Sequence, residues 1–399
     1  MATALRSKLG GMTSFAAYQN EIYLQGLGGA VPPFTTDPEA LEQSARDRLG
    51  PGPFWYVAGG AGSGATVRAN RSAFDRVQLV PRMLTNATER HLGVSVLGTE
   101  LPAPVMLAPV GVQSILHPDG ELATARAAAE LGIPMVLSTA SSHTIEEVAE
   151  ASGEGPRWYQ LYWPNDPDVC ASLLERAKKA GYTALVVTLD TWTLAWRPHD
   201  LDQAYLPFLR GVGTAIPFSD PVFRAGLQKS PEEDLPMAIL RWVQLFTGTD
   251  KSWDQLAFLR EHWDGPIVLK GIQHADDARK AVEFGMDGVV VSNHGGRQVD
   301  GAVGSLDALP SIVEAVGEQV DVLFDSGIRT GADIVKALAL GAKAVMVGRP
   351  FAYGLAHGGQ VGVRHVLRSL LADFDLTLGL SGHRSPAELG PDALRFNPC

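Results

Sequence analysis

From residue 104 onward, short apolar runs alternate with stretches in which apolar positions recur at helical spacing, such as GELATARAAAELG and PDVCASLLERAKKAG. Continuous apolar runs are typical of strands that are buried on both faces, and such strands are usually parallel. Eight apolar runs follow one another, at residues 104–110, 134–140, 157–163, 184–190, 266–272, 288–294, 321–327 and 344–350. The chain therefore predicts eight parallel strands that are joined by helices.

Eight strand–helix units predict one closed (β/α)8 TIM barrel, because each helix makes the right-handed crossover that parallel strands require. We expect residues 1–399 to form a single domain, with the barrel at about 100–385. The first hundred residues predict a helical extension, in which PFWYVAGGAG places Tyr56 before a glycine cluster. No Gly-Lys-Ser/Thr follows this cluster, so it is not a Walker phosphate loop.

The connection after the fourth apolar run is much longer than the others. The fifth run begins at residue 266, 82 residues after the fourth begins at 184. The insertion extends from about Trp196 to Trp253 and leaves the face of the barrel where the strands end. Its Trp, Phe and Leu content argues against a disordered linker, so we expect a lid or a subunit contact.

Composition limits the classes of function. The formal net charge of -11 disfavours a primary role on nucleic acid or on anionic membranes. No apolar stretch approaches the roughly 18 residues of a membrane span, and no signal-peptide core is present. Cys170 and Cys399 are too far apart for a disulfide framework or a zinc-ligand pattern. We therefore expect a cytoplasmic enzyme without a metal, and Met12 is an alternative start.

The run VVVSNHGGRQ carries the clearest chemistry, because an apolar strand delivers His294 and Arg297 into one glycine-softened turn. Histidine accepts a proton near neutral pH, and arginine presents a planar fork that matches a carboxylate. Active sites of such barrels lie where the strands end, which is the position of this turn. The turn indicates a site for an acid with a removable proton; the alternative is a buried histidine beside a core arginine.

The chain resembles the FMN-dependent 2-hydroxy-acid oxidases and dehydrogenases, and most closely their lactate 2-monooxygenase branch. The resemblance rests on NEIYLQG, YVAGGAG, PRML, APVGV, YQLYWPND, TLDTWTLAWRPHDL, LKGIQHADDA, SNHGGRQ and DSGIRTGADIVKALALGA, and it covers nearly the whole chain. It implies FMN as cofactor, a small L-2-hydroxy acid as substrate, O2 as oxidant and a homotetramer or larger homo-oligomer.

The resemblance also implies roles for single residues. His294 matches the catalytic base and Asp190 the carboxylate that orients it. Arg297 matches the arginine that binds the substrate carboxylate, with Arg197 as a second guanidinium, and Tyr56 and Tyr162 match the two phenols that contact the substrate. Lys270 matches a lysine that stabilises the negative charge of the reduced flavin. The implied cofactor contacts are Val110, Gly111, Ser138, Gln160, Thr188, Lys270, Ser292, Asp325, Gly327, Arg329, Gly348 and Arg349.

Two departures from the plant glycolate oxidase pattern favour the lactate-type members. Ala140 stands where that pattern has a tryptophan, which leaves room for a substrate with at least a methyl side chain. Gly111 in APVGV matches lactate monooxygenase, where many relatives have alanine. We interpret this glycine as reduced bulk in the pocket that oxygen and the product share.

The expected reaction is removal of the hydroxyl proton by His294 with hydride transfer to flavin N5; a carbanion route would use the same residues. If the keto acid stays while oxygen reacts, L-lactate gives acetate, CO2 and water. Three alternatives remain: an oxidase that releases keto acid and H2O2, a dehydrogenase with another electron acceptor, and a flavin-binding protein without catalysis.

Overall fold

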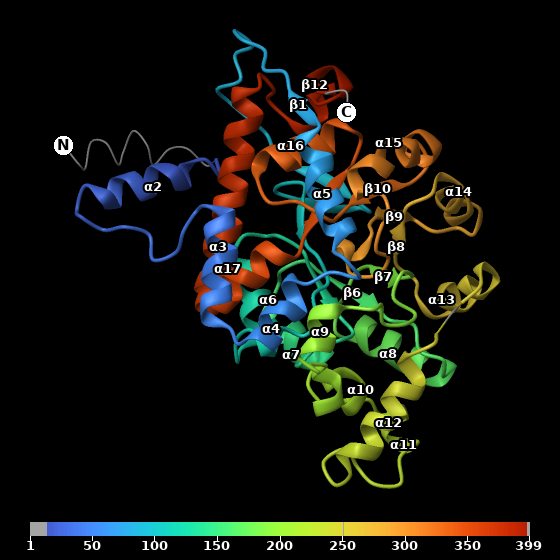
Figure 1. Ribbon diagram of the computed structural model, residues 1–399. Coiled ribbons are helices and arrows are strands. Elements are labelled where there is room, and N and C mark those ends of the chain that lie inside the picture. Colours follow the sequence, from blue (N-terminus) through green and yellow to red (C-terminus); the bar gives the residue numbers. More distant parts are fainter. Residues whose placement is uncertain (1–13, 250, 397–399) are drawn as a thin grey trace.

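A closed barrel of eight parallel strands forms the centre of the molecule (Figure 1). The computed structural model describes residues 14–249 and 251–396, so Met12 and Cys399 lie outside the described residues. In chain order the strands are β4 (Val105–Leu107), β5 (Met135–Ser138), β6 (Arg157–Leu161), β7 (Leu185–Thr188), β8 (Ile267–Ile272), β9 (Gly288–Val291), β10 (Asp321–Phe324) and β11 (Ala344–Val347). All eight predicted strands are present, and pairing of β11 with β4 closes the barrel.

Helices surround the barrel and bury apolar faces against it. They are α6 (Gly120–Glu130), α7 (Ile145–Ser152), α8 (Pro167–Lys179), α13 (Leu256–His262), α14 (Ala275–Glu283), α15 (Ser305–Val316), α16 (Gly331–Ala339) and α17 (Arg349–Leu380). Helix α8 shows how the sequence sets such an element: the Asp166 carboxylate caps its first turn, Pro167 occupies the first helical position, and Leu173 and Leu174 are buried. The (β/α)8 prediction is confirmed.

A short hairpin plugs the end of the barrel where the strands begin. It consists of β2 (Val94–Val96) and β3 (Thr99–Leu101). Val96 and Leu101 are buried in one cluster with inward-facing strand residues such as Trp158. The sequence predicted only helices in the first hundred residues, so this hairpin and the pairing of β1 (Val77–Leu79) with β12 (Leu394–Phe396) were missed.

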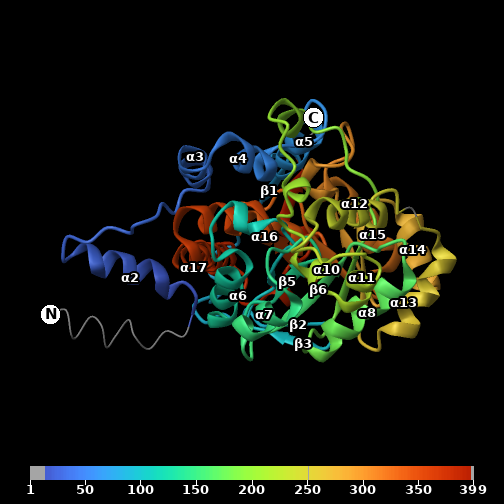
Figure 2. The same ribbon diagram turned by 90° about the horizontal axis from the view of Figure 1, so that it is seen from below.

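The predicted N-terminal helices are α2 (Ala17–Gly26), α3 (Pro38–Arg48), α4 (Pro51–Ala58) and α5 (Ala65–Asp75). Helix α2 projects from the body in both ribbon views (Figures 1 and 2), and it has no buried residue. Helices α4 and α5 instead lie at the end of the barrel where the strands terminate. There α5 contacts the turn that holds His294. The extension therefore contributes to the site.

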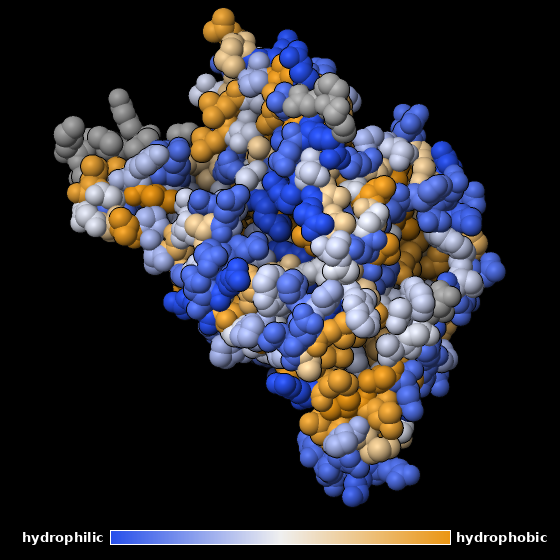
Figure 3. All heavy atoms as spheres, in the orientation of Figure 1, coloured by the Kyte–Doolittle hydropathy of each residue, from blue (hydrophilic) through white to orange (hydrophobic). Residues whose placement is uncertain are grey.

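The insertion after β7 is folded and contains α9 (Pro198–Asp202), α10 (Ala215–Ser219), α11 (Pro221–Ala225) and α12 (Leu235–Phe246). Helix α12 is apolar on two sides. Trp242 and Phe246 line a cavity, whereas Met237 and Leu240 are exposed. Figure 3 shows hydrophobic residues gathered at the end of the molecule where α12 lies in Figure 1. The insertion thus covers a cavity over the barrel. Within the described ranges, no helix combines the length and apolar character needed to cross a bilayer.

Candidate active site

Strand periodicity sorts the barrel interior into an apolar layer and a polar layer above it. Side chains two residues apart point to the same face of a strand, and Trp158 and Val268 belong to the apolar interior cluster. One step further along the strands come buried polar residues, as at Gln160 and Lys270. The full set of these residues is Ser138, Gln160, Thr188, Lys270, Ser292 and Asp325. Six of the predicted cofactor contacts therefore form the top layer of the barrel.

His294 and Asp190 meet above this layer, from the loops after β9 and β7. The His294 Nδ1 atom lies 2.7 Å from Asp190 Oδ1, and Thr191 Oγ1 lies 2.9 Å from the same nitrogen. Because a carboxylate only accepts hydrogen bonds, Nδ1 carries the proton and Nε2 is the basic nitrogen. The expected orientation of His294 by Asp190 agrees with this geometry.

Burial and neighbouring charges set the protonation of this pair. Burial lowers the pKa of His294 against the raising effect of Asp190, so the imidazole is neutral near pH 7. Burial favours the neutral form of Asp190, but His294 and Lys270 outweigh it and hold its pKa at about 2. The result is a neutral base beside a permanent carboxylate.

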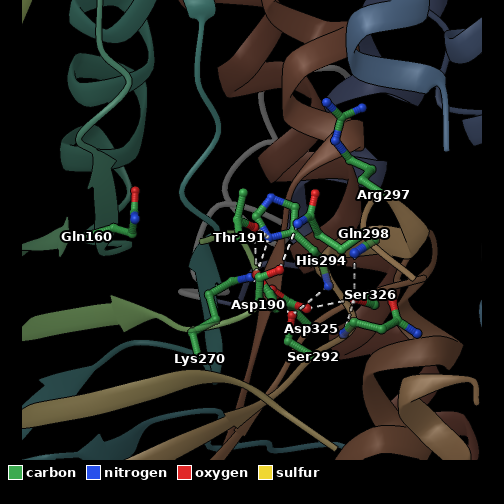
Figure 4. A network of polar contacts seen from close by, with 12 residues as sticks. Gln160, Asp190, Thr191, Lys270, Ser292, His294, Arg297, Gln298, Asp325 and Ser326 are labelled. Carbon is green, nitrogen blue, oxygen red and sulfur yellow. Dashed lines mark hydrogen bonds and ion pairs between the residues drawn. The ribbon is translucent and has the colours of Figure 1, made fainter. Parts of the chain in front are cut away.

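Lys270 anchors a polar network under His294 (Figure 4). Its Nζ atom lies 3.2 Å from Asp325 Oδ2 and donates to Ser292 Oγ at 3.0 Å. Burial opposes its charge, but Asp325 and Asp190 outweigh burial and raise its pKa. Ser292 Oγ also accepts the backbone N–H of His294 at 3.1 Å. The network thus joins a buried cation to the turn that carries the base.

Ser326 extends the network to the same turn. Its hydroxyl donates to Asp325 Oδ1 at 2.7 Å and accepts the backbone N–H of Gly295 at 3.0 Å. Asn293 holds the turn at a second point, because its side chain exchanges two hydrogen bonds with the side chain of Asn70 in α5, at 2.7 and 2.8 Å. The turn that holds His294 is therefore tied to both the loop after β10 and α5.

Two arginines of the predicted site, Arg197 and Arg297, line the cavity, and their side chains have different partners. Arg197 is buried, and burial together with Arg297 lowers its pKa to about 10. In Figure 4 the guanidinium of Arg297 points away from His294. Its Nη1 atom donates to Gly59 O at 3.2 Å, and its charge lies 5.3 Å from the centre of the Tyr56 ring. Arg297 therefore contacts the glycine cluster of the N-terminal extension.

Tyr56 and Tyr162 also line the cavity. Burial raises the pKa of both phenols, so both keep their protons and can donate hydrogen bonds without adding charge. Phe208 and Trp242 of the insertion stack with ring centres 4.7 Å apart, and Phe208 meets Tyr56 edge to face. The aromatic rings of Tyr56, Phe208 and Trp242 thus cover the polar layer of the barrel.

The structure brings most of the predicted residues to one cavity. Those that line it are Tyr56, Val110, Gly111, Tyr162, Arg197, Lys270, His294, Arg297, Asp325, Gly327, Arg329, Gly348 and Arg349. The other five are absent from the lining and support it from below or behind: Asp190, Ser138, Gln160, Thr188 and Ser292. Ser138 Oγ donates to Gln160 Oε1 at 3.0 Å, and the buried Gln160 Nε2 atom has no hydrogen-bond partner among residues 14–249 and 251–396.

One end of the cavity carries two partly buried cations, Arg329 and Arg349. Burial lowers the pKa of both, in the case of Arg349 to about 10. Three nitrogens of Arg349 donate to the main-chain carbonyls of Val57, Gly59 and Gly295. Within residues 14–249 and 251–396, neither arginine forms an ion pair with a carboxylate. This end of the cavity therefore favours an anion, whereas the described residues contain no cluster of metal ligands.

Gly111 packs against Ala140. A Cβ atom at position 111 would lie 2.3 Å from the main-chain oxygen of Ala140 and 2.6 Å from its Cβ. The two departures singled out in the sequence are thus neighbours, and both line the cavity. This close approach accounts for a glycine at position 111, and the expected effect of reduced bulk on oxygen and product stays a prediction.

Sequence reasoning missed Thr191, Ser326 and Gln298. Gln298 ends the SNHGGRQ segment and directly follows Arg297, so the motif contained it, but polar residues were sought mainly at strand ends. Ser326 has a left-handed backbone with φ of 82°, which no residue pattern announces. Thr191 and Ser326 line the cavity and also form hydrogen bonds that hold the loops around His294, whereas Gln298 holds these loops from outside the cavity.

Comparison with known proteins matches residues 45–396 to the model of the family described as FMN-dependent dehydrogenase. The chain is 52% identical over 386 residues to an FMN-dependent alpha-hydroxy acid dehydrogenase of Penicillium citrinum, covering 96% of each chain. It is 42% identical over 345 residues to an L-lactate oxidase of Lysinibacillus sphaericus, covering 86% of this chain and 89% of that protein. A crystal structure of mandelate oxidase superimposes with a TM-score of 0.80 and 38% identity, covering 91% of this chain and 99% of that one.

Proposed function

The chain belongs to the FMN-dependent dehydrogenase family, uses FMN to oxidise 2-hydroxy acids, and on this premise we propose that its substrate is a small L-2-hydroxy acid, with L-lactate as the candidate. The observation that carries this proposal is the meeting of a neutral His294, held by Asp190, with Arg197 and Lys270 at one cavity. A base and a cation of this kind match the hydroxyl and the carboxylate of such an acid.

The cavity residues fit FMN. Gln160 Nε2 is a buried donor without an acceptor in the described part of the chain, and a flavin ring edge offers acceptors. Lys270 is a buried cation in the same layer, suited to a ring that gains negative charge. Arg329 and Arg349 at one end of the cavity suit a phosphate, and Gly327, with φ of 107°, gives the backbone shape of the turn beside them. When bound, FMN supplies the acceptor for the substrate's two electrons and α-hydrogen and then passes the electrons to an oxidant.

The chain's own residues do the binding and the proton transfer. Arg197 holds the substrate carboxylate, with Arg297 as the second cation of the pocket. His294 Nε2 accepts the hydroxyl proton, and Asp190 stabilises the resulting imidazolium through Nδ1. Tyr56 and Tyr162, which keep their protons, fix the substrate oxygens.

The insertion suggests the fate of the product. Trp242 and Phe246 of the insertion line the cavity, so these side chains are placed to slow the escape of a 2-oxo acid. We therefore favour oxidative decarboxylation, in which L-lactate and O2 give acetate, CO2 and water. Release of pyruvate and H2O2, or transfer of electrons to another acceptor, is the second candidate, and the relative named L-lactate oxidase favours the former.

The test is product analysis under air with the FMN-loaded protein and L-lactate. The proposal predicts acetate and CO2 in near-equal amounts with little free peroxide. Stoichiometric pyruvate and peroxide would leave the oxidation in place and reject the decarboxylation. Turnover with a dye but not with O2 would instead identify a dehydrogenase.

We also propose that residues 1–399 act as one catalytic domain and assemble as a homotetramer or larger homo-oligomer. Helix α2 supports assembly, since it projects from the body and leaves Tyr23 and Leu27 exposed. Light scattering of the purified protein measures the mass, and a monomer would reject this part.

A further inference from the structure

Gln298 joins two loops of the site although it does not line the cavity. Its Nε2 atom donates to the main-chain oxygen of Asp190 at 2.7 Å and to that of Thr193 at 2.9 Å. Its Oε1 atom accepts a hydrogen bond from Arg197 Nη2 at 2.7 Å. One amide thus connects the loop of the catalytic base with the loop that carries the orienting carboxylate and the substrate arginine.

The orientation of this amide is fixed by its partners. The carbonyl oxygens of Asp190 and Thr193 can only accept, and the guanidinium of Arg197 can only donate. The NH2 group must therefore face the two carbonyls and the oxygen must face the arginine. Rotation of the amide by half a turn would oppose like groups at all three contacts.

Arg197 receives no neutralising contact from this arrangement. Its two hydrogen-bond partners among the described residues are Arg297 O, at 2.9 Å from Nε, and Gln298 Oε1. Both acceptors are neutral, and Asp200 acts on Arg197 at longer range without a hydrogen bond in the described part of the chain. The buried guanidinium therefore keeps its full positive charge, and its Nη1 atom remains for a ligand.

An amide at position 298 meets two requirements that a carboxylate cannot meet together. It donates to two carbonyls, and it anchors Arg197 without cancelling the charge that attracts an anion. We propose that Gln298 is a positioning residue that aims Arg197 at the substrate carboxylate while leaving its charge uncompensated. This inference rests on the proposed function, in which Arg197 binds that carboxylate.

The test compares Gln298→Glu with Gln298→Met in the FMN-loaded protein. Oxalate binding by calorimetry and KM against kcat for L-lactate are the readouts, and lactamide serves as the uncharged probe. Gln298→Glu keeps an acceptor for Arg197 but neutralises it, so we expect oxalate affinity to fall at least about tenfold and KM to rise by a similar factor. Gln298→Met leaves Arg197 charged but unanchored, so the loss should be smaller. Gln273→Glu, at the exposed end of β8, makes the same change of charge away from the site.

The comparison of lactate with lactamide separates positioning from mere support. If Gln298 only supported the fold, loss of its two hydrogen bonds to the carbonyls of Asp190 and Thr193 would be common to both variants and would weaken lactate and lactamide alike. Equal loss in both variants, equal loss of lactamide and lactate, or unchanged oxalate affinity in Gln298→Glu would overturn the inference. Failure of the unaltered protein to react with any 2-hydroxy acid would instead reject the proposed function.

Discussion

His294 and Asp190 lie 104 positions apart in sequence, yet a hydrogen bond of 2.7 Å joins His294 Nδ1 to the carboxylate. The bond fixes which imidazole nitrogen is protonated and leaves Nε2 as the base. Thr191 contacts both partners, at 2.8 Å from the carboxylate oxygen and 2.9 Å from the imidazole nitrogen. The pair therefore has one orientation, held from two sides.

Replacement of His294 by Gln should remove the base while keeping a polar side chain of similar size. We expect an unchanged flavin spectrum and a rate of flavin reduction by L-lactate that falls about 10²- to 10⁴-fold, the usual contribution of a positioned base. Stopped-flow absorbance under nitrogen measures this rate. A rate within a few-fold of the unaltered protein would remove His294 from the mechanism.

The pH dependence should follow the lowered pKa of His294. The base must be neutral, so kcat/KM should be constant above about pH 6.5 and fall as pH drops through a value below 6.5. Asp190 raises the pKa of His294, so Asp190→Asn should move the acid limb to still lower pH while the plateau falls. An acid limb above pH 6.5, or a shift of that limb upward in Asp190→Asn, would contradict this assignment.

Lys270 and Asp325 form a buried ion pair of 3.2 Å, with side-chain exposures of 4% and 8%. Lys270→Met leaves Asp325 buried and unpaired, which should lower the free energy of unfolding by about 3 to 5 kcal/mol. Urea unfolding followed by circular dichroism measures the loss. The double variant Lys270→Met with Asp325→Asn should recover most of it, and an equal or larger loss in the double variant would show that the pair is not the cause.

The cover of the cavity should decide the fate of the 2-oxo acid. Trp242→Ala removes an aromatic side chain that covers the cavity. Product should therefore escape sooner, and the yield of pyruvate and peroxide should rise relative to acetate. A change of about 1.4 kcal/mol in the barrier to escape shifts this ratio about tenfold. Leu240→Ala on the exposed side of α12 is the matched control and should leave the ratio unchanged. An identical product ratio in the unaltered protein and in both variants would show that Trp242 does not control how long the product is retained.

The polar layer of the site could be predicted because strand periodicity and chain order determine it. Lys270 follows Val268 by two residues on one strand, so its inward direction was contained in the pattern. The hairpin β2–β3 was missed because three-residue strands carry too little periodicity to detect. The role of Gln298 was missed for another reason: its partners are main-chain carbonyls, which every residue has, and only the folded loops bring them within 2.9 Å.

The direction of Arg297 also depends on tertiary structure. The sequence paired it with the substrate carboxylate, and the structure directs its Nη1 atom to the carbonyl of Gly59. That contact joins the turn after β9 to the end of α4, elements from distant parts of the chain. Its role toward the substrate therefore stays a prediction.

We conclude that this protein oxidises 2-hydroxy acids with bound FMN, and we place the reaction at the cavity around His294. The decisive measurement is anaerobic addition of L-lactate to the purified yellow protein, followed by a panel of larger L-2-hydroxy acids and their D-enantiomers. We expect the absorbance of oxidised flavin to bleach with at least one L-acid and to return when air is admitted. A yellow protein whose spectrum no 2-hydroxy acid changes would contradict the claim.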